Sequence, residues 1–172
     1  MGTEIERKFL LHDDTWRGAV ARTLRIRQGY LVGAAALAAG LARASVRVRV
    51  QDDRAWLNIK SARSAISRDE YDYPIALPDA ENMLRTLCSG VLEKCRHVVP
   101  VRDFHFEIDV FGGRNAGLTV AELELPAADA PYPRPPWLGV EVSHLSRYLN
   151  VNLIAHPYAE WSAVERSGAD AC

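Results

Sequence analysis

Val46-Arg47-Val48-Arg49-Val50 alternates valine with arginine at every position. Successive side chains of an extended strand point to opposite faces, so the three valines share one face and the two arginines share the other. Valine is favoured in strands, and this period produces no helical stripe. The segment therefore predicts a half-buried strand, within residues 45–51, whose polar face carries two positive charges.

The same two-residue period recurs along most of the chain, whereas helical periodicity is scarce. Polar segments at 51–54, 100–103 and 112–115 have the composition of hairpin turns. We expect strands at 3–10, 24–31, 45–51, 55–61, 67–75, 92–101, 104–111 and 118–126. About eight strands with short connections predict an antiparallel barrel or a strongly curled sheet.

Few helices are expected, which makes the fold class α+β but mainly β, with the helices at the periphery. The clearest helix is 79–89, where Asp79 is a suitable N-cap and Gly90 a stop. The Ala-rich stretch 34–44 is either a short helix or a loop insertion. Residues 126–136 are proline-rich and predict an extended connector, and 145–156 predict a terminal helical segment. We expect a single domain over 1–157 and a C-terminal tail over 158–172.

Composition excludes several classes of protein. The 172 residues carry a formal net charge of −1, so no global attraction to nucleic acid or to an anionic membrane is expected. The N-terminus has no apolar segment of a signal peptide, and no apolar run is long enough to span a bilayer. Cys88, Cys95 and Cys172 are odd in number and form no CxxC pair. We expect free thiols, a cytoplasmic location and a monomer or homodimer.

Five of the expected strands carry two charges of one sign, two residues apart. The acid pairs are Glu4 with Glu6, Glu107 with Asp109 and Glu122 with Glu124, and the base pairs are Arg47 with Arg49 and Lys94 with Arg96. Any single pair is explained by a solvated outer face. In all five strands, however, the two like charges of a pair repel one another. This repulsion lowers the stability of the fold unless ligands of opposite charge lie between the charges.

A metal-bound phosphate compound would satisfy both kinds of pair at once. Carboxylates suit hard cations such as Mg²⁺ or Mn²⁺, and lysine and arginine suit phosphate oxygens. Of 21 basic residues only Lys8, Lys60 and Lys94 are lysine, the residue that offers a compact charge with a tunable pKa. No GxxxxGK[ST] loop is present, so the phosphate chemistry is not that of a P-loop enzyme.

Glu4-Ile5-Glu6-Arg7-Lys8 resembles the N-terminal ExERK motif of the CYTH superfamily, also called the triphosphate tunnel metalloenzymes. The resemblance continues in order through about residues 3–156. It includes Arg27-Gln28-Gly29-Tyr30, Arg47-x-Arg49, Lys60, Glu70, Lys94-x-Arg96, Glu107-x-Asp109, Glu122-x-Glu124 and Gly139-x-Glu141-Val142. All three lysines fall on these motifs. The short bacterial inorganic triphosphatases are the members that this chain is most similar to.

The resemblance implies a closed eight-stranded antiparallel β-barrel that forms a tunnel, with Mg²⁺ or Mn²⁺ as cofactor. It implies metal-dependent hydrolysis of triphosphate compounds, most simply of inorganic triphosphate to diphosphate and phosphate. Alternatives within the superfamily are a class IV adenylyl cyclase and a thiamine triphosphatase. A non-catalytic polyphosphate-binding module is a further alternative. The expected partner is a small-molecule triphosphate.

The site residues that the resemblance implies fall into three groups. The metal ligands would be Glu4, Glu6, Glu107, Asp109, Glu122 and Glu124. The triphosphate would be bound by Lys8, Arg47, Arg49, Lys60, Lys94, Arg96 and, in a segment that departs from close relatives, Arg147. Glu70 would orient water, and Lys94 or Tyr30 would take part in proton transfer. Arg7 lies on the opposite strand face from Glu6, so a structural ion pair is expected for it. For His105, a structural hydrogen-bonded role is favoured over metal binding.

Overall fold

The computed structural model describes residues 2–61 and 67–168, without the side chains of residues 2–4, 67 and 68. The strands are β1 (Gly2–Leu11), β2 (Arg22–Val32), β3 (Ala44–Gln51), β4 (Arg54–Ser61), β5 (Ser67–Ile75), β6 (Val91–Val101), β7 (Phe104–Phe111), β8 (Thr119–Glu124) and β9 (Leu138–Glu141). The α-helices are α1 (Ala34–Ala38), α2 (Leu77–Thr86), α3 (Asn150–Ala155) and α4 (Ala163–Ser167). Short 3-10 turns are η1 (Thr15–Ala19), η2 (Gly113–Asn115), η3 (Ser146–Tyr148) and η4 (Tyr158–Glu160).

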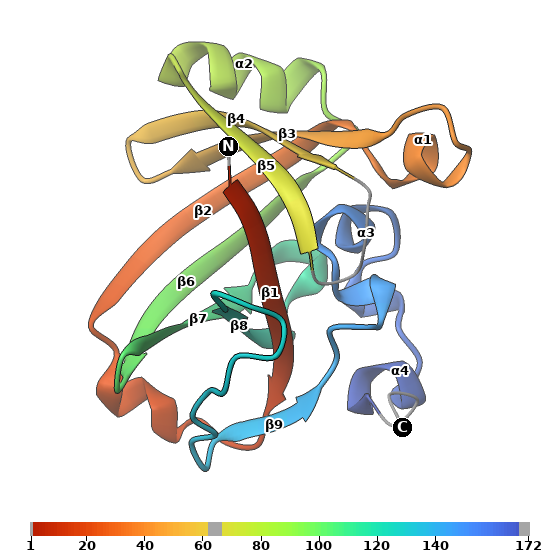
Figure 1. Ribbon diagram of the computed structural model, residues 1–172. Coiled ribbons are helices and arrows are strands. Elements are labelled where there is room, and N and C mark those ends of the chain that lie inside the picture. Colours follow the sequence, from red (N-terminus) through yellow and green to blue (C-terminus); the bar gives the residue numbers. More distant parts are fainter. Residues whose placement is uncertain (1, 62–66, 169–172) are drawn as a thin grey trace.

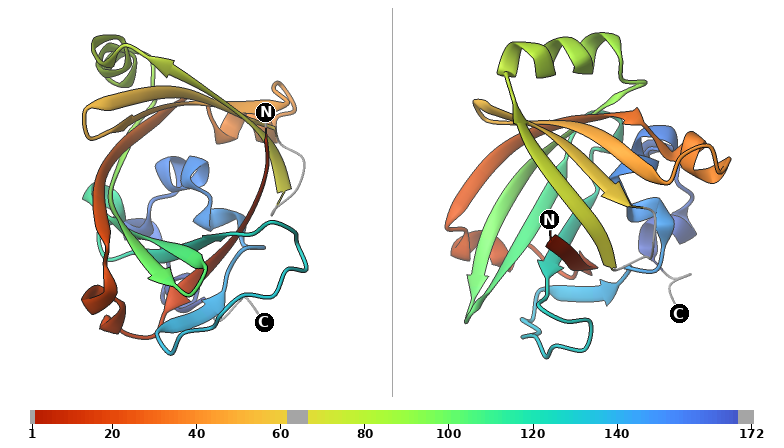
Figure 2. Two further views of the ribbon diagram at one scale, coloured as in Figure 1. Left: turned by 60° about the vertical axis from the view of Figure 1, so that its left-hand side comes forward. Right: turned by 45° about the horizontal axis from the view of Figure 1, so that its top comes forward.

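All nine strands belong to one strongly curved antiparallel sheet, in the order β5-β4-β3-β2-β6-β7-β8-β1-β9. The first residues of β1 also pair with β5, from Gly2 opposite Glu70 to Ile5 opposite Ser67, so the two ends of the row from β5 to β1 are joined. In Figure 2 the strands surround a central space, with α2 outside them. The antiparallel, mainly β architecture with a few peripheral helices is confirmed.

The expected count of eight strands is wrong, because β9 adds a ninth beside the second half of β1. β9 has only four residues and follows the proline-rich connector. Four residues are too few for a two-residue period to stand out in the sequence. Its pairing with β1 shifts register between Phe9 and Leu11.

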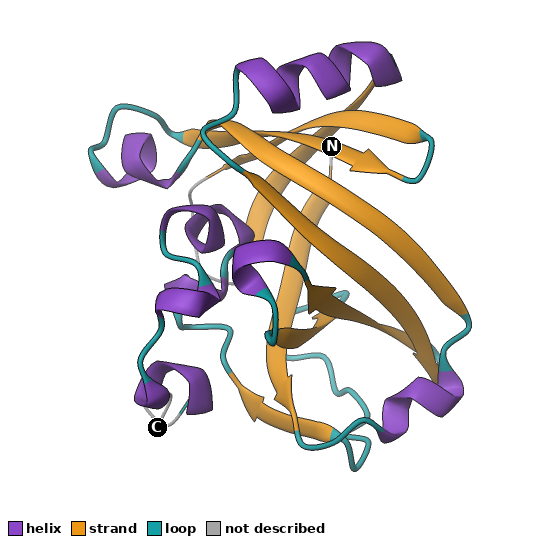
Figure 3. Cartoon of the chain, turned by 180° about the vertical axis from the view of Figure 1, so that it is seen from behind, coloured by secondary structure: helices purple, strands orange, loops and turns teal. Residues whose placement is uncertain are grey.

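The helices differ from expectation mainly at their ends. α2 begins at Leu77, with Ala76 rather than Asp79 as its N-cap. Pro78 lies in the first turn, where its fixed φ suits a helix, and Asp79 lies there too, close to the positive end of the helix dipole. The Ala-rich segment forms the five-residue helix α1. The terminal helical segment divides into η3 and α3. Figure 3 shows the helices lying around the strands.

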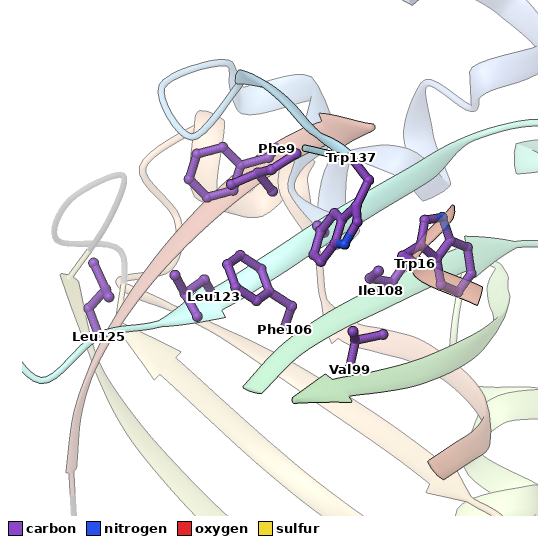
Figure 4. Packing of buried hydrophobic residues seen from close by; sticks show 10 residues of the cluster. Phe9, Trp16, Val99, Phe106, Ile108, Leu123, Leu125 and Trp137 are labelled. Atoms are coloured by element: carbon purple, nitrogen blue, oxygen red, sulfur yellow. The ribbon is translucent and has the colours of Figure 1, made fainter. Parts of the chain in front are cut away.

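The largest hydrophobic cluster lies outside the ring of strands. Phe9, Phe106 and Ile108 are fully buried beneath η1 and the segment that leads into β9. Phe106 meets Trp137 edge-on, with ring centroids 5.1 Å apart. Figure 4 shows this packing. Because side chains alternate along a strand, burying these residues on the outer face directs their charged neighbours inward.

A second apolar layer covers β3, where Val48 and Val50 pack against Ala80 and Leu84 of α2. A third cluster contains Leu92, Leu153 and Trp161. Tyr158 and Trp161 lie within the expected tail, and both pack against this cluster. The described part of the chain contains no helix long and apolar enough to cross a membrane.

Two smaller expectations are confirmed. Arg7 points away from the ring and forms an ion pair with Glu141 of β9, with Nη1 and Oε1 2.9 Å apart. Cys88 and Cys95 are free thiols. Cys172 lies outside the described residues.

Candidate active site

The inward face of the ring encloses a cavity of about 710 Å³. Eleven of the fifteen predicted site residues line it: Glu6, Lys8, Tyr30, Arg47, Arg49, Lys60, Glu70, Arg96, Glu107, Glu122 and Glu124. They come from eight strands, and strand register brings them together. Glu6 lies opposite Glu124 between β1 and β8, and Lys8 lies opposite Glu122.

Lys8 occupies the centre of the acidic side. Its ammonium group lies 2.5 Å from Oε1 of Glu6 and also donates to Glu122. Burial lowers the pKa of Lys8, but the two carboxylates more than offset this and raise it above its ordinary value. Burial likewise raises the pKa of Glu122, but Lys8, Lys94 and Arg96 hold it well below its ordinary value. Both groups are therefore charged at neutral pH.

Arg96 binds three carboxylates at once. Its Nε and Nη2 lie 2.7 Å from the two oxygens of Asp109, and the same guanidinium reaches Glu107 and Glu122. Burial raises the pKa of Glu107, and Arg96 opposes this shift. The planar five-donor guanidinium suits such a junction, which an ammonium group could not span.

Lys94 and Asp109 were expected to contact the ligand, but in the structure both lie away from the cavity. Their side chains are completely buried and paired with one another, and neither lines the cavity. Burial, followed by the charge of Arg96, lowers the pKa of Lys94 to about 8. The physical reason is the register of β6 and β7, which places Asp109 directly opposite Arg96 and beneath it. Both residues therefore position Arg96.

The basic side contains buried guanidinium groups with unfilled hydrogen-bonding capacity. Arg47 donates its Nε to Asn58, 3.0 Å away, but its Nη2 has no hydrogen-bond partner and lies 3.7 Å from Glu70. The buried Nε of Arg49 also has no partner. Burial, together with the charges of Arg47 and Arg96, lowers the pKa of Arg49 to about 10. Buried donors without acceptors are costly, so an anion entering the cavity would be stabilised here.

The charges of the cavity do not balance. Seven carboxylates and five cationic groups line it among the described residues, an excess of two negative charges. A triphosphate adds further negative charge, so it needs additional cations to enter. Glu6 and Glu124 are like charges directly opposite one another on paired strands; Lys8 already pairs with Glu6, and a further cation would reduce the remaining repulsion.

A divalent metal fits this donor set. No group of three or more acidic, histidine or cysteine side chains converges on one point among the described residues. Mg²⁺ does not require one, because it is usually bound by one or two carboxylates together with substrate phosphates and water. Glu6 and Glu124 would supply those carboxylates. The side chain of Glu4, a further predicted ligand in β1, lies outside the description.

The prediction that Arg147 contacts phosphate is not supported, because Arg147 does not line the cavity. Its guanidinium lies over the rings of Tyr148 and Trp161, 5.0 and 5.3 Å from their centroids, and donates to the carbonyl of Glu165. The short turn η3 directs the side chain towards this aromatic cluster, which the sequence could not indicate.

We expect Arg147→Ala to leave triphosphate turnover within twofold of the wild type while lowering the free energy of unfolding by about 1–2 kcal/mol, because two cation–π contacts are lost. Steady-state kinetics and urea unfolding measure the two effects. A large rise in the KM for triphosphate would show instead that Arg147 binds the substrate.

Several lining residues were missed by sequence reasoning. Asp72 shares the inward parity of Glu70, so extending the alternation along β5 would have added it to the predicted site. The side chain of His105 was expected to be hydrogen-bonded; instead it is exposed at the cavity and makes no hydrogen bond within the described residues. Asn150 comes from α3, and only the tertiary structure brings it here.

The sequence and the fold match a known family. The CYTH domain model matches residues 2–158, so the chain belongs to the CYTH domain family. An inorganic triphosphatase of Acetivibrio thermocellus is 40% identical over 92% of this chain and 97% of its own length. An inorganic triphosphatase of Nitrosomonas europaea is 32% identical over 86% and 94%. A crystal structure of an inorganic triphosphatase superposes with a TM-score of 0.64 at 31% identity, covering 90% of this chain and 95% of the other.

Proposed function

We propose that this chain hydrolyses inorganic triphosphate to diphosphate and phosphate with Mg²⁺ or Mn²⁺ as cofactor. The observation that carries the proposal is the pair of buried guanidinium groups, on Arg47 and Arg49, whose donors lack acceptors inside a cavity that also presents opposed carboxylates. The names of the two curated relatives support the choice of substrate.

In this proposal the two sides of the cavity have different roles. Arg47, Arg49 and Lys60 hold the phosphate chain by charge-assisted hydrogen bonds, and Arg96 faces it from β6. Glu6 and Glu124 hold the metal, with Glu122 as a third oxygen donor that Lys8 and Arg96 keep ionised. When bound, the metal supplies charge compensation on the phosphate oxygens and acidifies water.

The chain's own residues would then orient the reaction. Fixed cations aligned along the phosphates favour in-line attack on the terminal phosphorus and stabilise the charge that builds up on the departing diphosphate. Glu70, held 3.2 Å from Lys60, is the carboxylate placed to orient the attacking water. Tyr30 lines the same cavity and remains a proposal for proton transfer, whereas Lys94 does not reach it.

We also propose that the eight strands from β5 round to β1 act as a closed tunnel, which the pairing of β1 with β5 supports. We expect the chain to act as a monomer or a homodimer. The free thiols of Cys88 and Cys95 support a reducing, cytoplasmic location.

One assay separates the proposed function from its alternatives. The protein is supplied with Mg²⁺ or Mn²⁺ and with inorganic triphosphate, ATP or thiamine triphosphate, and both phosphate and cyclic AMP are measured. We expect phosphate from inorganic triphosphate at the highest kcat/KM and no cyclic AMP. Cyclic AMP from ATP would instead indicate a cyclase, preferred turnover of thiamine triphosphate a thiamine triphosphatase, and tight binding without turnover a binding module.

We expect Arg49→Met to raise the KM for inorganic triphosphate about tenfold, which corresponds to ~1.4 kcal/mol of lost binding. Stability should hardly fall, because Arg49 is repelled by Arg47 and Arg96 and its Nε has no partner. Steady-state kinetics and thermal unfolding measure both quantities. An unchanged KM would show that Arg49 does not bind the phosphate chain.

A further inference from the structure

The charged side chains that line the cavity differ in exposure. The side chains of Lys8, Arg47 and Arg96 are only 5–8% exposed. By contrast, Asp72 and Asp103 line the same cavity from exposed positions. Glu122 is equally buried at 6% exposure, so the interior holds charges of both signs, whereas the exposed lining positions among the described residues carry carboxylates and no lysine or arginine.

The exposed carboxylates gather at one end of the cavity. Asp103 lies in the turn between β6 and β7, and Phe106 opposite Leu123 places the start of β7 beside the end of β8, where Glu124 lies. Asp72 is two residues beyond Glu70, which pairs with Gly2 at the start of β1. The start of β1 and the end of β8 are neighbours, because Glu6 lies opposite Glu124. Asp72, Asp103 and Glu124 form what we call the acidic mouth.

Asp72 and Asp103 have no ion-pair partner among the described residues, so their charges are not neutralised. Leu149, Asn150 and Val151, which line the other end of the cavity, carry no charge. A phosphate chain that extends past the interior cations towards the acidic mouth therefore meets carboxylates and no lysine or arginine among the described lining residues, and it is repelled there.

We propose that Asp72 and Asp103 limit the length of the phosphate chain that the cavity accepts. Three phosphates lie among the interior cations, and each additional phosphate adds negative charge close to the two uncompensated carboxylates. The acidic mouth thereby selects inorganic triphosphate over linear tetraphosphate and longer polyphosphates. This inference names the substrate range of the proposed function and rests on that function.

The test compares the wild type with the double variant Asp72→Asn/Asp103→Asn. With Mg²⁺ present, kcat/KM is measured for inorganic triphosphate, linear tetraphosphate and a long-chain polyphosphate. We expect the double variant to keep triphosphate turnover within about twofold and to raise the tetraphosphate-to-triphosphate ratio of kcat/KM about tenfold, or ~1.4 kcal/mol. The gain should shrink at high salt, because exposed charges are screened.

Asp53→Asn is the matched control, since Asp53 is exposed in the turn between β3 and β4 and does not line the cavity. An unchanged ratio in the double variant, or an equal rise in Asp53→Asn, would overturn the inference. Dissociation constants for triphosphate and tetraphosphate, measured by calorimetry, test the chain-length preference of the acidic mouth independently of turnover. Absence of hydrolysis would overturn the proposed function alone. Equal ratios of the two dissociation constants in the wild type and in the double variant would overturn only the proposed role of the acidic mouth.

Discussion

Metal-dependent triphosphate hydrolysis is expected to fall at least about 100-fold, or ~2.7 kcal/mol of transition-state stabilisation, when Glu6 and Glu124 are both replaced by glutamine. Their carboxylates face one another across β1 and β8, and both line the cavity. The amide keeps the shape of the side chain but loses the charge that a hard cation requires. Phosphate release measured across a range of Mg²⁺ concentrations gives the effect.

Stability should not fall in parallel, because two like charges on directly opposed strand positions repel. Lys8 loses Glu6 as a partner but keeps Glu122. The control is Glu81→Gln on α2, which neutralises a carboxylate that pairs with Arg27 outside the cavity. Full activity in the double variant, with an unchanged Mg²⁺ requirement, would refute the metal assignment.

Arg96→Met is expected to lower the free energy of unfolding by about 3–5 kcal/mol, since removing one partner of a buried ion pair leaves uncompensated charge. Asp109 is completely buried and would retain only Lys94, while Glu107 and Glu122 would lose their shared donor. Urea unfolding measures the loss, because the midpoint reports stability at constant m.

Arg114→Met serves as the control, because Arg114 pairs with Glu160 at side-chain exposures of 69% and 48%. An exposed pair of this kind contributes no more than about 1 kcal/mol. The loss of unfolding free energy for Arg96→Lys should lie between the losses for Arg96→Met and Arg114→Met, since an ammonium group keeps the charge but cannot reach three carboxylates. A loss below about 1 kcal/mol for Arg96→Met would show that Arg96 is not the electrostatic centre of the ring.

The candidate site was largely predictable because its residues lie on strands. Strand parity alone assigns Glu6 and Lys8 to one face and Arg7 to the other, as observed in the cavity and in the ion pair with Glu141. Parity gives the face of a residue but not its depth. Lys94 and Asp109 face inward, yet their mutual pairing buries them below the cavity.

Residues outside the strands were not predictable in this way. Arg147 lies on a short 3-10 turn, whose direction depends on how Tyr148 and Trp161 pack. Asn150 reaches the cavity only because α3 docks beside it. No local period in the sequence encodes either position, because each depends on contacts between distant segments.

The alternation of charged and apolar residues by itself determined the strands, their two faces and the residues available for phosphate and metal. Only the tertiary structure decided which face is the interior, how deep each charge lies and that a ninth strand is present. The physical reason is that periodicity is a property of one strand, whereas burial and neutralisation are properties of the whole ring. Apolar residues packed beneath α2, η1 and the segment before β9 cover the outer face, so the charged face encloses the cavity.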